Sequence, residues 1–238
     1  MSDHTPNISH TGSLLKLISE QGLLPGDRLP SERELAIMFD MSRSSLREVL
    51  IRLETLRIIE LRPQSGIYLR LDPNQRSVDA LVLYAETNTP LTEPDIKQAI
   101  EVRRMIEIQG VRLACERRTD ADLKSIWDVL SRSQRTLLDK GSLEDLDPEF
   151  HLCLLSCTQN KMLLQVANVY YTISRTRREV YFRDHEQNVR SHKQHMELFE
   201  ALNDRDADQA QRVLESHLQG VGDYFNQIFK SSEPVEPK

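Results

Sequence analysis

Three histidines and one aspartate in the second half of the chain have the residue types and spacing of a metal site. Asp147 and His151 are four residues apart, so on a helix both side chains project from one face and can chelate one ion. His195 and His217 each lie in an apolar stripe of helical spacing, which predicts that both point inward. Three imidazoles and a carboxylate on three helices of a bundle can meet at one octahedral or distorted tetrahedral site, with open positions for water or a ligand.

The same residues can also be explained without a metal. A single histidine on an apolar helix face is more often a hydrogen-bonded residue of the core or its boundary. His192 lies three residues before His195 and shares its face, and His185 stands in a charged stretch where we expect it to be exposed. The spacing alone therefore leaves both explanations open.

A second group of polar residues, between residues 31 and 47, has the pattern of a nucleic-acid reader. Ser31 and Glu34 have the spacing of a capping box, which predicts a helix over 32–39. Ser42 opens a second helix with a buried stripe over 46–56 and with Arg43 and Arg47 on another face. Two short helices joined by a tight turn match a helix-turn-helix, whose second helix inserts its N-terminal residues into the major groove.

A β-hairpin is expected directly after the second helix. The apolar runs 58–61 and 67–71 flank the turn-prone segment 62–66, as in the wing of a winged helix-turn-helix. Any one of the arginines can belong to an ordinary solvated helix face. The order of capping box, turn, arginine-bearing helix and hairpin is far more specific, and it favours DNA binding.

Composition restricts the remaining classes. The chain has 238 residues, 39% of them hydrophobic, only 8 glycines and 5% aromatic residues, which favours a soluble, mainly helical protein over a sandwich, barrel or Rossmann core. No run approaches the ~18 apolar residues of a membrane span, and the polar N-terminus has no secretion signal. The three cysteines, Cys115, Cys153 and Cys157, are an odd number and fit reduced thiols in the cytoplasm.

Charge separates the chain into two parts. Residues 12–72 carry nine basic and nine acidic residues, so the net charge of −6 belongs entirely to the rest of the chain. A pI near 5.7 argues against nonspecific binding to polyanions and leaves room for a local arginine face that docks on DNA.

Residues 25–36 (PGDRLPSERELA) and 41–50 (MSRSSLREVL) resemble the DNA-binding signature of the GntR family of bacterial transcription regulators, over about residues 12–71. The resemblance implies these operator contacts: Arg33, Arg43 and Arg47, with Ser31, Ser42 and Ser44 near phosphates and Gly66 at a wing tip in the minor groove. Arg57 departs from the family, which usually has a glycine closing the recognition helix. Either Arg57 adopts the left-handed conformation at a cost of ~1 kcal/mol, or the helix ends differently.

The second half resembles the FCD ligand-binding domain of the FadR subfamily over about residues 95–225. The matching segments are 101–107, 147–151 with Asn160, 195–202 with Asp206, and 216–218. In metal-binding members an aspartate and three histidines hold a divalent ion, often zinc, and a small carboxylate effector completes the shell. The resemblance implies that Asp147, His151, His195 and His217 are the ligands here, with manganese, nickel and iron as alternatives to zinc.

The resemblance also matches Arg103 to the arginine that pairs with the effector carboxylate. An arginine fork can hold a carboxylate bidentately, although Arg103 can also simply pair with Glu107 across one helical turn. The arginine run Arg175, Arg177 and Arg178 supplies second candidates, which solvation or contacts across a dimer explain more simply.

The predicted fold is mainly α, with an N-terminal winged helix-turn-helix and small β-hairpin wing, and a C-terminal antiparallel all-α bundle. The expected boundaries are a disordered N-terminus over 1–11, the winged helix-turn-helix over 12–71, a linker over 72–94 with a short apolar helix, the helical FCD domain over 95–230, and a disordered tail over 231–238. Breaks between helices are expected near 119–120, 140–142, 159–160 and 203–204.

The expected function is that of a cytoplasmic, ligand-responsive regulator, more a repressor than an activator, and not an enzyme. It binds double-stranded operator DNA as a homodimer, takes a small organic acid as effector, and has no membrane partner. One alternative is a metalloenzyme domain fused to a DNA-binding head, against which stands the absence of a His-Glu-x-x-His motif. In another alternative the metal itself is the signal.

Overall fold

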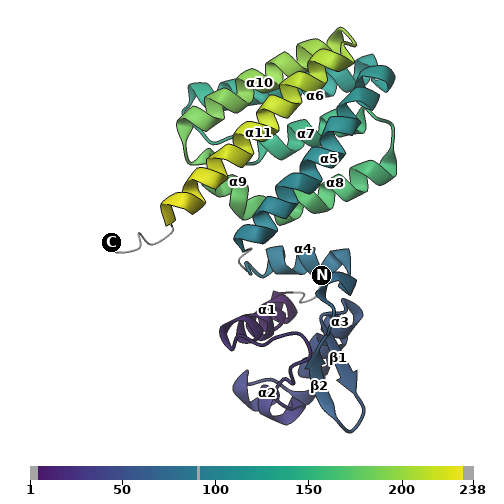
Figure 1. Ribbon diagram of the computed structural model, residues 1–238, viewed down its shortest axis with the longest axis vertical. Helices are drawn as coiled ribbons and strands as arrows, with labels where there is room; N and C mark the ends of the chain where they lie inside the picture. Colours follow the sequence, from purple (N-terminus) through teal and green to yellow (C-terminus); the bar gives the residue numbers. More distant parts are fainter. Residues whose placement is uncertain (1–4, 90–91, 233–238) are drawn as a thin grey trace. The chain divides into compact units, whose positions relative to one another are not determined.

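The computed structural model describes residues 5–89 and 92–232. It confirms the predicted fold class, with a small winged helix-turn-helix and a helical bundle (Figure 1). The chain divides into two compact units, Met1–Pro90 and Leu91–Lys238, each with a hydrophobic core of its own.

The first unit contains four helices and one hairpin among its described residues. Their bounds are α1 Thr5–Glu20, α2 Glu32–Met38, α3 Arg43–Thr55, β1 Ile59–Arg62, β2 Gly66–Leu69 and α4 Val78–Glu86, with a 3-10 turn at Pro73–Gln75. The strands pair antiparallel with Ile59 opposite Leu69. Leucines on one face of α3 pack against α1 and the hairpin to form the core, as the stripe over 46–56 predicts.

Helix α3 ends in the left-handed conformation that its sequence makes costly. Arg57 has φ of 58°, its amide bonds to the carbonyl of Glu54, and the next amide, of Ile58, bonds to Leu53. This is a Schellman closure with arginine where glycine is favoured. The first of the two alternatives at Arg57 is therefore the one adopted, and the hairpin follows at once.

Two segments at the ends of the first unit are packed into its core more fully than expected. Helix α1 begins at Thr5, within the expected disordered N-terminus 1–11, because the buried Thr11 and the leucines that follow it pack that helix into the core; residues 1–4 lie outside the described residues. In the expected linker 72–94, α4 buries Ala80 and Leu83 in the same core. At the other end, the last helix continues to Ser232, and the rest of the expected tail, 233–238, is not described.

The second unit is an antiparallel bundle of seven helices among its described residues. Their bounds are α5 Glu93–Arg117, α6 Asp120–Leu138, α7 Leu146–Ser156, α8 Lys161–Ile173, α9 Arg175–Phe182, α10 His185–Asn203 and α11 Ala207–Ser232. Side-chain caps at Thr92, Thr119, Asn160 and Asp184 begin α5, α6, α8 and α10. Helices α5 and α11 lie side by side, and α10 packs on α11 and α6 (Figure 1).

Helix α7 occupies the middle of this bundle and supplies two of the candidate ligands. It packs against α5, α6 and α8, and its buried residues include Asp147, Phe150 and His151. The main core surrounds it with apolar residues from α5, α6, α10 and α11. Polar groups on α7 that face inward must therefore find partners within the bundle.

No helix in the described residues is both long and apolar enough to cross a bilayer.

Candidate DNA-binding surface and metal centre

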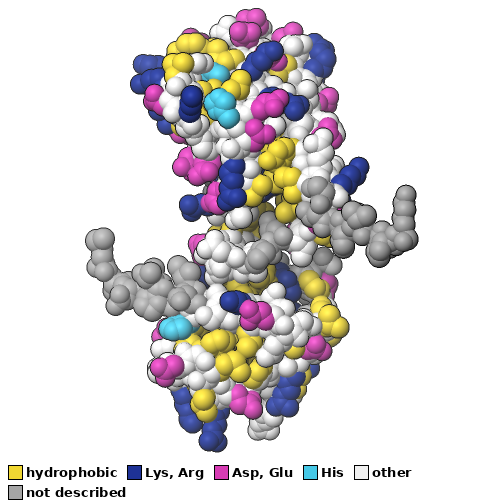
Figure 2. Space-filling model, turned by 90° about the vertical axis from the view of Figure 1, so that its left-hand side faces the viewer, with side chains coloured by type: hydrophobic (Ala, Val, Ile, Leu, Met, Phe, Trp, Pro, Cys, Tyr) yellow, Lys and Arg dark blue, Asp and Glu magenta, His cyan; other side chains and the backbone are white. Residues whose placement is uncertain are grey.

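The residues expected to contact DNA lie on one surface of the first unit. A groove between α2, α3 and the hairpin is lined by Ser31, Arg47 and Gly66 among others, and an adjoining hollow is lined by Arg33 and Arg43. Figure 2 shows Lys and Arg side chains gathered at the end of this unit where Figure 1 places α2 and the hairpin. Cations are therefore gathered at that end on the face that Figure 2 shows, although residues 12–72 carry no net charge.

The serines of this surface begin the two helices. Ser31 and Glu34 form a reciprocal capping box at α2, and Ser42 accepts the amide of Ser45 at α3 at 3.1 Å. The Ser42 hydroxyl also lies 2.9 Å from that of Ser44. All these side chains are exposed or half-exposed. Hydroxyls and free amides at helix starts are suited to phosphate oxygens.

Two arginines that the sequence argument did not assign lie at the hairpin, Arg62 on β1 and Arg28 from the segment before α2. Gly66 has φ of 129° and a Cβ there would meet the Nε of Arg28 at 3.0 Å, so the glycine allows that guanidinium to lie against the wing. Arg62 stacks on Tyr68, 4.3 Å from the ring centroid, and pairs with Glu60 at 3.0 Å. Arg28 belongs to the matched signature segment, which was the available signal for it; nothing in the sequence singled out Arg62.

Asp147, His151, His195 and His217 meet inside the second unit. One ligand atom from each lies within 4.8 Å of the others, and all four residues are buried. The Nε2 atoms of His151 and His195 are each 3.6 Å from Oδ1 of Asp147. Helices α7, α10 and α11 supply them, as the stripes predict.

The three imidazoles turn unpartnered nitrogens toward one another. The Nε2 atoms of His151, His195 and His217 are buried without a hydrogen-bond partner. An unpartnered buried polar atom is costly in the absence of a ligand. A carboxylate and three such nitrogens form the donor set that Zn²⁺, Fe²⁺, Ni²⁺ or Mn²⁺ accepts, so the residues present fit a divalent ion.

Groups outside the cluster orient two of these rings. Nδ1 of His151 lies 2.8 Å from Oε2 of Glu107, and Nδ1 of His217 lies 3.0 Å from Oε1 of Gln194. Because an amide oxygen only accepts, Nδ1 of His217 carries the proton and its Nε2 keeps a lone pair for a metal. Phe150 stacks on His195 with ring centroids 4.0 Å apart.

Electrostatics hold three of the four groups in the form that binds a cation. Burial, together with the charge of His151, lowers the pKa of His217 to about 3, and the same causes place the pKa of His195 well below its usual value. Burial raises the pKa of Asp147, but His151 and Arg103 outweigh it and hold that pKa well below the usual range. His195 and His217 are therefore neutral and Asp147 is ionised, which are the forms that ligate metals. At His151 burial lowers the pKa but the Glu107 carboxylate outweighs it and raises the pKa, so this imidazole has to release its proton when it binds an ion.

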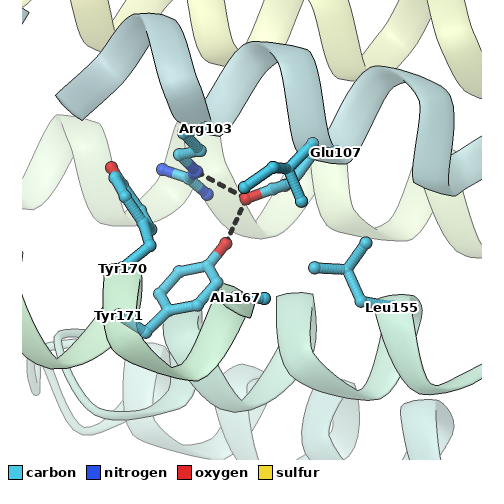
Figure 3. A pocket seen from close by; sticks show the side chains of 7 residues that line it. Arg103, Glu107, Leu155, Ala167, Tyr170 and Tyr171 are labelled. Carbon is cyan, nitrogen blue, oxygen red and sulfur yellow. Dashed lines mark hydrogen bonds and ion pairs between the residues drawn. The ribbon is translucent and has the colours of Figure 1, made fainter. Parts of the chain in front are cut away.

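Arg103 is buried beside the cluster, where its partner is Glu107. Its Nε donates to Oε1 of Glu107 at 2.7 Å, and the same oxygen accepts the hydroxyl of Tyr171, as Figure 3 shows. The Nη2 atom of Arg103 is buried without a partner. Arg103 therefore makes the expected helical pair and still has a free donor.

A small pocket lies against this arginine. Arg103, Glu107, Tyr170, Tyr171 and Leu155 are among its lining residues (Figure 3), and it leaves no room for a water molecule as it stands. A ligand would have to displace some of these side chains.

The other polar residues of the sequence analysis lie in different environments. His185 is exposed, as expected, and His192 lies 2.9 Å from Oε1 of Gln134 through its Nε2, outside the metal cluster. Arg175 is exposed, whereas Arg177 and Arg178 are buried. Solvation thus accounts only for the first of the three arginines.

Two family models match the chain. Residues 11–69 match the model described as bacterial regulatory proteins, gntR family, and residues 98–220 match the FCD domain. The matched ranges fall within the first and second structural units respectively.

Curated relatives match over nearly the full chain. The HTH-type transcriptional regulator LutR of Bacillus subtilis is 30% identical, covering 91% of this chain and 99% of that protein. The HTH-type transcriptional repressor NanR of Salmonella typhimurium is 31% identical over 88% of this chain and 80% of its own. The Uxu operon regulator of Haemophilus influenzae is 25% identical, covering 95% and 83%. All three are named as regulators, none as an enzyme.

Solved structures share the fold. A Listeria monocytogenes protein, Lar, described as controlling expression of the agr system, superposes with a TM-score of 0.65 at 18% identity, covering 93% of this chain and 96% of that one. McbR/YncC of E. coli gives a TM-score of 0.55 at 18% identity, covering 96% and 100%.

Proposed function

Because the chain belongs to the GntR family of bacterial regulatory proteins and carries an FCD domain, we propose that it is a ligand-responsive transcriptional repressor. DNA binding and transcriptional regulation come with the family. The repressor role, the metal, the carboxylate effector and the homodimer are our proposals. The protein acts in the cytoplasm, where a bacterial operator lies.

The arrangement of the DNA-binding surface suits a complex in which α3 reads the base edges and the serines contact phosphates that position the protein on the DNA. Arg43 and Arg47 are exposed on the first two turns of α3, the part of a recognition helix that reaches base edges. Ser31, Arg33, Ser42 and Ser44 lie where phosphates would pass, and Gly66 lies at the wing that would enter the minor groove.

The effector site is proposed at the buried cluster. The observation that carries it is the convergence of three unpartnered Nε2 atoms on Asp147 in the buried interior of the bundle. The ion held by Asp147, His151, His195 and His217 would supply a Lewis-acid site for a carboxylate or an adjacent hydroxyl. The free Nη2 of Arg103 would donate to the same carboxylate.

Effector binding would change operator affinity through two states of the dimer. An effector that binds the dimer more tightly at one spacing of its DNA-binding units shifts the population toward that spacing. An effector that binds both spacings equally tightly leaves the population unchanged. Each 1.4 kcal/mol of coupling changes DNA affinity about tenfold.

A face of the bundle with exposed apolar residues supports the homodimer. Helices α5 and α8 pack together and expose Val102, Met105, Met162 and Val166. Helix α8 carries a single charged residue, Lys161. On α5 the exposed Glu101 lies at the edge of this face, next to Val102. A two-fold axis brings identical faces together, so an apolar face with few like charges suits a second copy of the chain.

Metal analysis with an organic-acid screen tests the effector site. We expect about one divalent ion per chain in the wild type, loss of that ion in His195→Ala and Asp147→Ala, and an acid that raises the melting temperature only when metal is present. A His192→Ala variant, altered on the same helix outside the cluster, should keep the ion. A wild type that cannot be loaded with metal would show that the four residues are core packing. Operator affinity that follows metal alone would make the metal the signal.

A further inference from the structure

Three arginine side chains lie in the interior of the second unit, and only one of them has a carboxylate partner among the described residues. Arg103, Arg177 and Arg178 are 3%, 6% and 7% exposed. Arg103 pairs with Glu107. Arg178 donates to the carbonyls of Glu144 and Tyr171 and to the hydroxyl of Ser174. Arg177 has no carboxylate partner and only one hydrogen bond among the described residues, to Tyr170.

The contacts of Arg177 are a phenol and two aromatic rings. Its Nη2 donates to the hydroxyl of Tyr170 at 2.7 Å, and its guanidinium carbon lies 5.8 Å from the centroid of Tyr170 and 5.6 Å from that of Phe225. Its Nε is buried without a hydrogen-bond partner. Aromatic faces stabilise a desolvated guanidinium only in part, so a donor and most of a charge remain uncompensated.

Tyr170 connects this arginine to the small pocket beside Arg103. Tyr170 lines the pocket beside Arg103 (Figure 3), and the guanidinium carbon of Arg103 also lies 5.8 Å from the Tyr170 ring centroid. The two guanidinium groups are therefore at most twice that distance apart. Each has one buried nitrogen with no partner, Nη2 of Arg103 and Nε of Arg177.

The charges of this interior do not balance. The buried carboxylates among the described residues of the unit are Glu107 and Asp147, against three buried guanidinium groups. A divalent ion at the histidine cluster would add two further positive charges. Buried charges are unfavourable unless they are paired and hydrogen-bonded, so one ligand carboxylate at Arg103 would still leave Arg177 unpaired.

We propose that the effector is a short dicarboxylate, with one carboxylate at the metal and Arg103 and the second at Arg177. The inference rests on the proposed function and adds a second anion subsite to it. Tyr170, whose hydroxyl now takes a donor of Arg177, is displaced when the second carboxylate takes its place. Each guanidinium carbon lies 5.8 Å from the Tyr170 ring centroid, and the upper limit that this sets on their separation favours short linear acids such as malonate, succinate and glutarate.

The test compares a diacid with its own half-ester, which keeps the length and removes one charge. Titration calorimetry on the metal-loaded full chain would measure malonate, succinate, glutarate and their monomethyl esters. We expect the wild type to bind the best diacid at least tenfold more tightly than its half-ester. In Arg177→Met that advantage should disappear, with the half-ester affinity unchanged within twofold.

Two further variants serve as controls for Arg177→Met. Arg175→Met, an exposed arginine on the same helix paired with Glu179, should bind the diacid as the wild type does. Arg177→Lys retains a charge, so it should recover part of the diacid preference even if Arg177→Met folds poorly. The wild-type comparison of diacid and half-ester requires no variant at all.

Failure of this inference is distinguishable from failure of the proposed function. Equal wild-type affinity for every diacid and its half-ester, or equal losses for both in Arg177→Met, would overturn the second subsite. Binding of monocarboxylates alone would do the same while leaving the metal and Arg103 site intact. Failure of every acid to bind, or of the protein to take up metal, would overturn both.

Discussion

Replacing Gln194 tests how the metal centre is organised, because Gln194 contacts one histidine and no other candidate ligand in the described contacts. Its Oε1 accepts the proton on Nδ1 of His217 at 3.0 Å and so presents the lone pair on Nε2. Gln194→Met keeps the length of the side chain and removes the acceptor. We expect this variant to fold and to bind metal more weakly.

The magnitude follows from what the hydrogen bond does. Loss of one neutral hydrogen bond costs the metal-free protein about 1 kcal/mol. Loss of the outer partner of a ligating histidine lowers metal affinity about 10- to 100-fold, or about 1.4–2.7 kcal/mol of binding free energy. At free metal 100 times the wild-type Kd, metal stabilises the wild type by about 2.7 kcal/mol, and the variant by only about 0.4–1.4 kcal/mol.

The assay is competition with a chromophoric chelator, using protein first stripped of metal, together with thermal melts at fixed free metal. Gln194→Glu, which retains an acceptor oxygen, should bind nearly as the wild type does, and Lys193→Met, an exposed neighbour, should not differ from it. If Gln194→Met binds metal within twofold of the wild type while His217→Ala does not bind, the tautomer of His217 is not set by this contact and the reasoning is wrong.

Three further predictions concern the rest of the molecule. Arg47→Ala should weaken binding to an operator selected with the wild type by about 1–3 kcal/mol without changing metal content. Arg52→Ala, on α3 but paired with Glu86, should have a smaller effect. Fluorescence anisotropy measures the operator affinity of both variants, and equal affinity in the two would show that α3 is not the helix that reads the bases. Val166→Asp should shift the chain from dimer to monomer in sedimentation velocity, while Asn168→Asp, exposed on the same helix, should not. A dimer retained in both variants would show that the α5–α8 face is not the dimer interface. Arg57→Gly should stabilise the first unit by up to about 1 kcal/mol in urea unfolding by relieving the φ of 58°, and a destabilised variant would show that no strain is stored there.

Most helix ends of the bundle could be predicted, because they depend on local groups. The expected breaks near 119–120, 140–142, 159–160 and 203–204 all fall between observed helices or on their terminal residues, where capping side chains and left-handed residues stop the helix. The separations of α8 from α9 at Ser174 and of α9 from α10 at 183–184 were missed. Neither contains glycine or proline, and continuous helical periodicity crosses both.

The ends of the two units were predicted less well. The polar composition of residues 1–11 suggested disorder, but helix α1 extends back to Thr5 because the leucines after it anchor the whole helix. The segment 72–94 was expected as a linker around a short helix. Its Ala80 and Leu83 belong to the core of the first unit, a contact with distant residues that periodicity cannot reveal.

Local sequence patterns were enough to predict the types of most elements, the surface that carries Arg43 and Arg47, and the inward direction of three histidines, because each depends on residues close together in the chain. Tertiary structure alone decided that ligand atoms from α7, α10 and α11 lie within 4.8 Å of each other. It also decided that Glu107 serves both Arg103 and His151, and that Arg177 is buried beside Tyr170. These relations join residues far apart in the chain, and the packing of helices sets the distances between them, which no local pattern encodes.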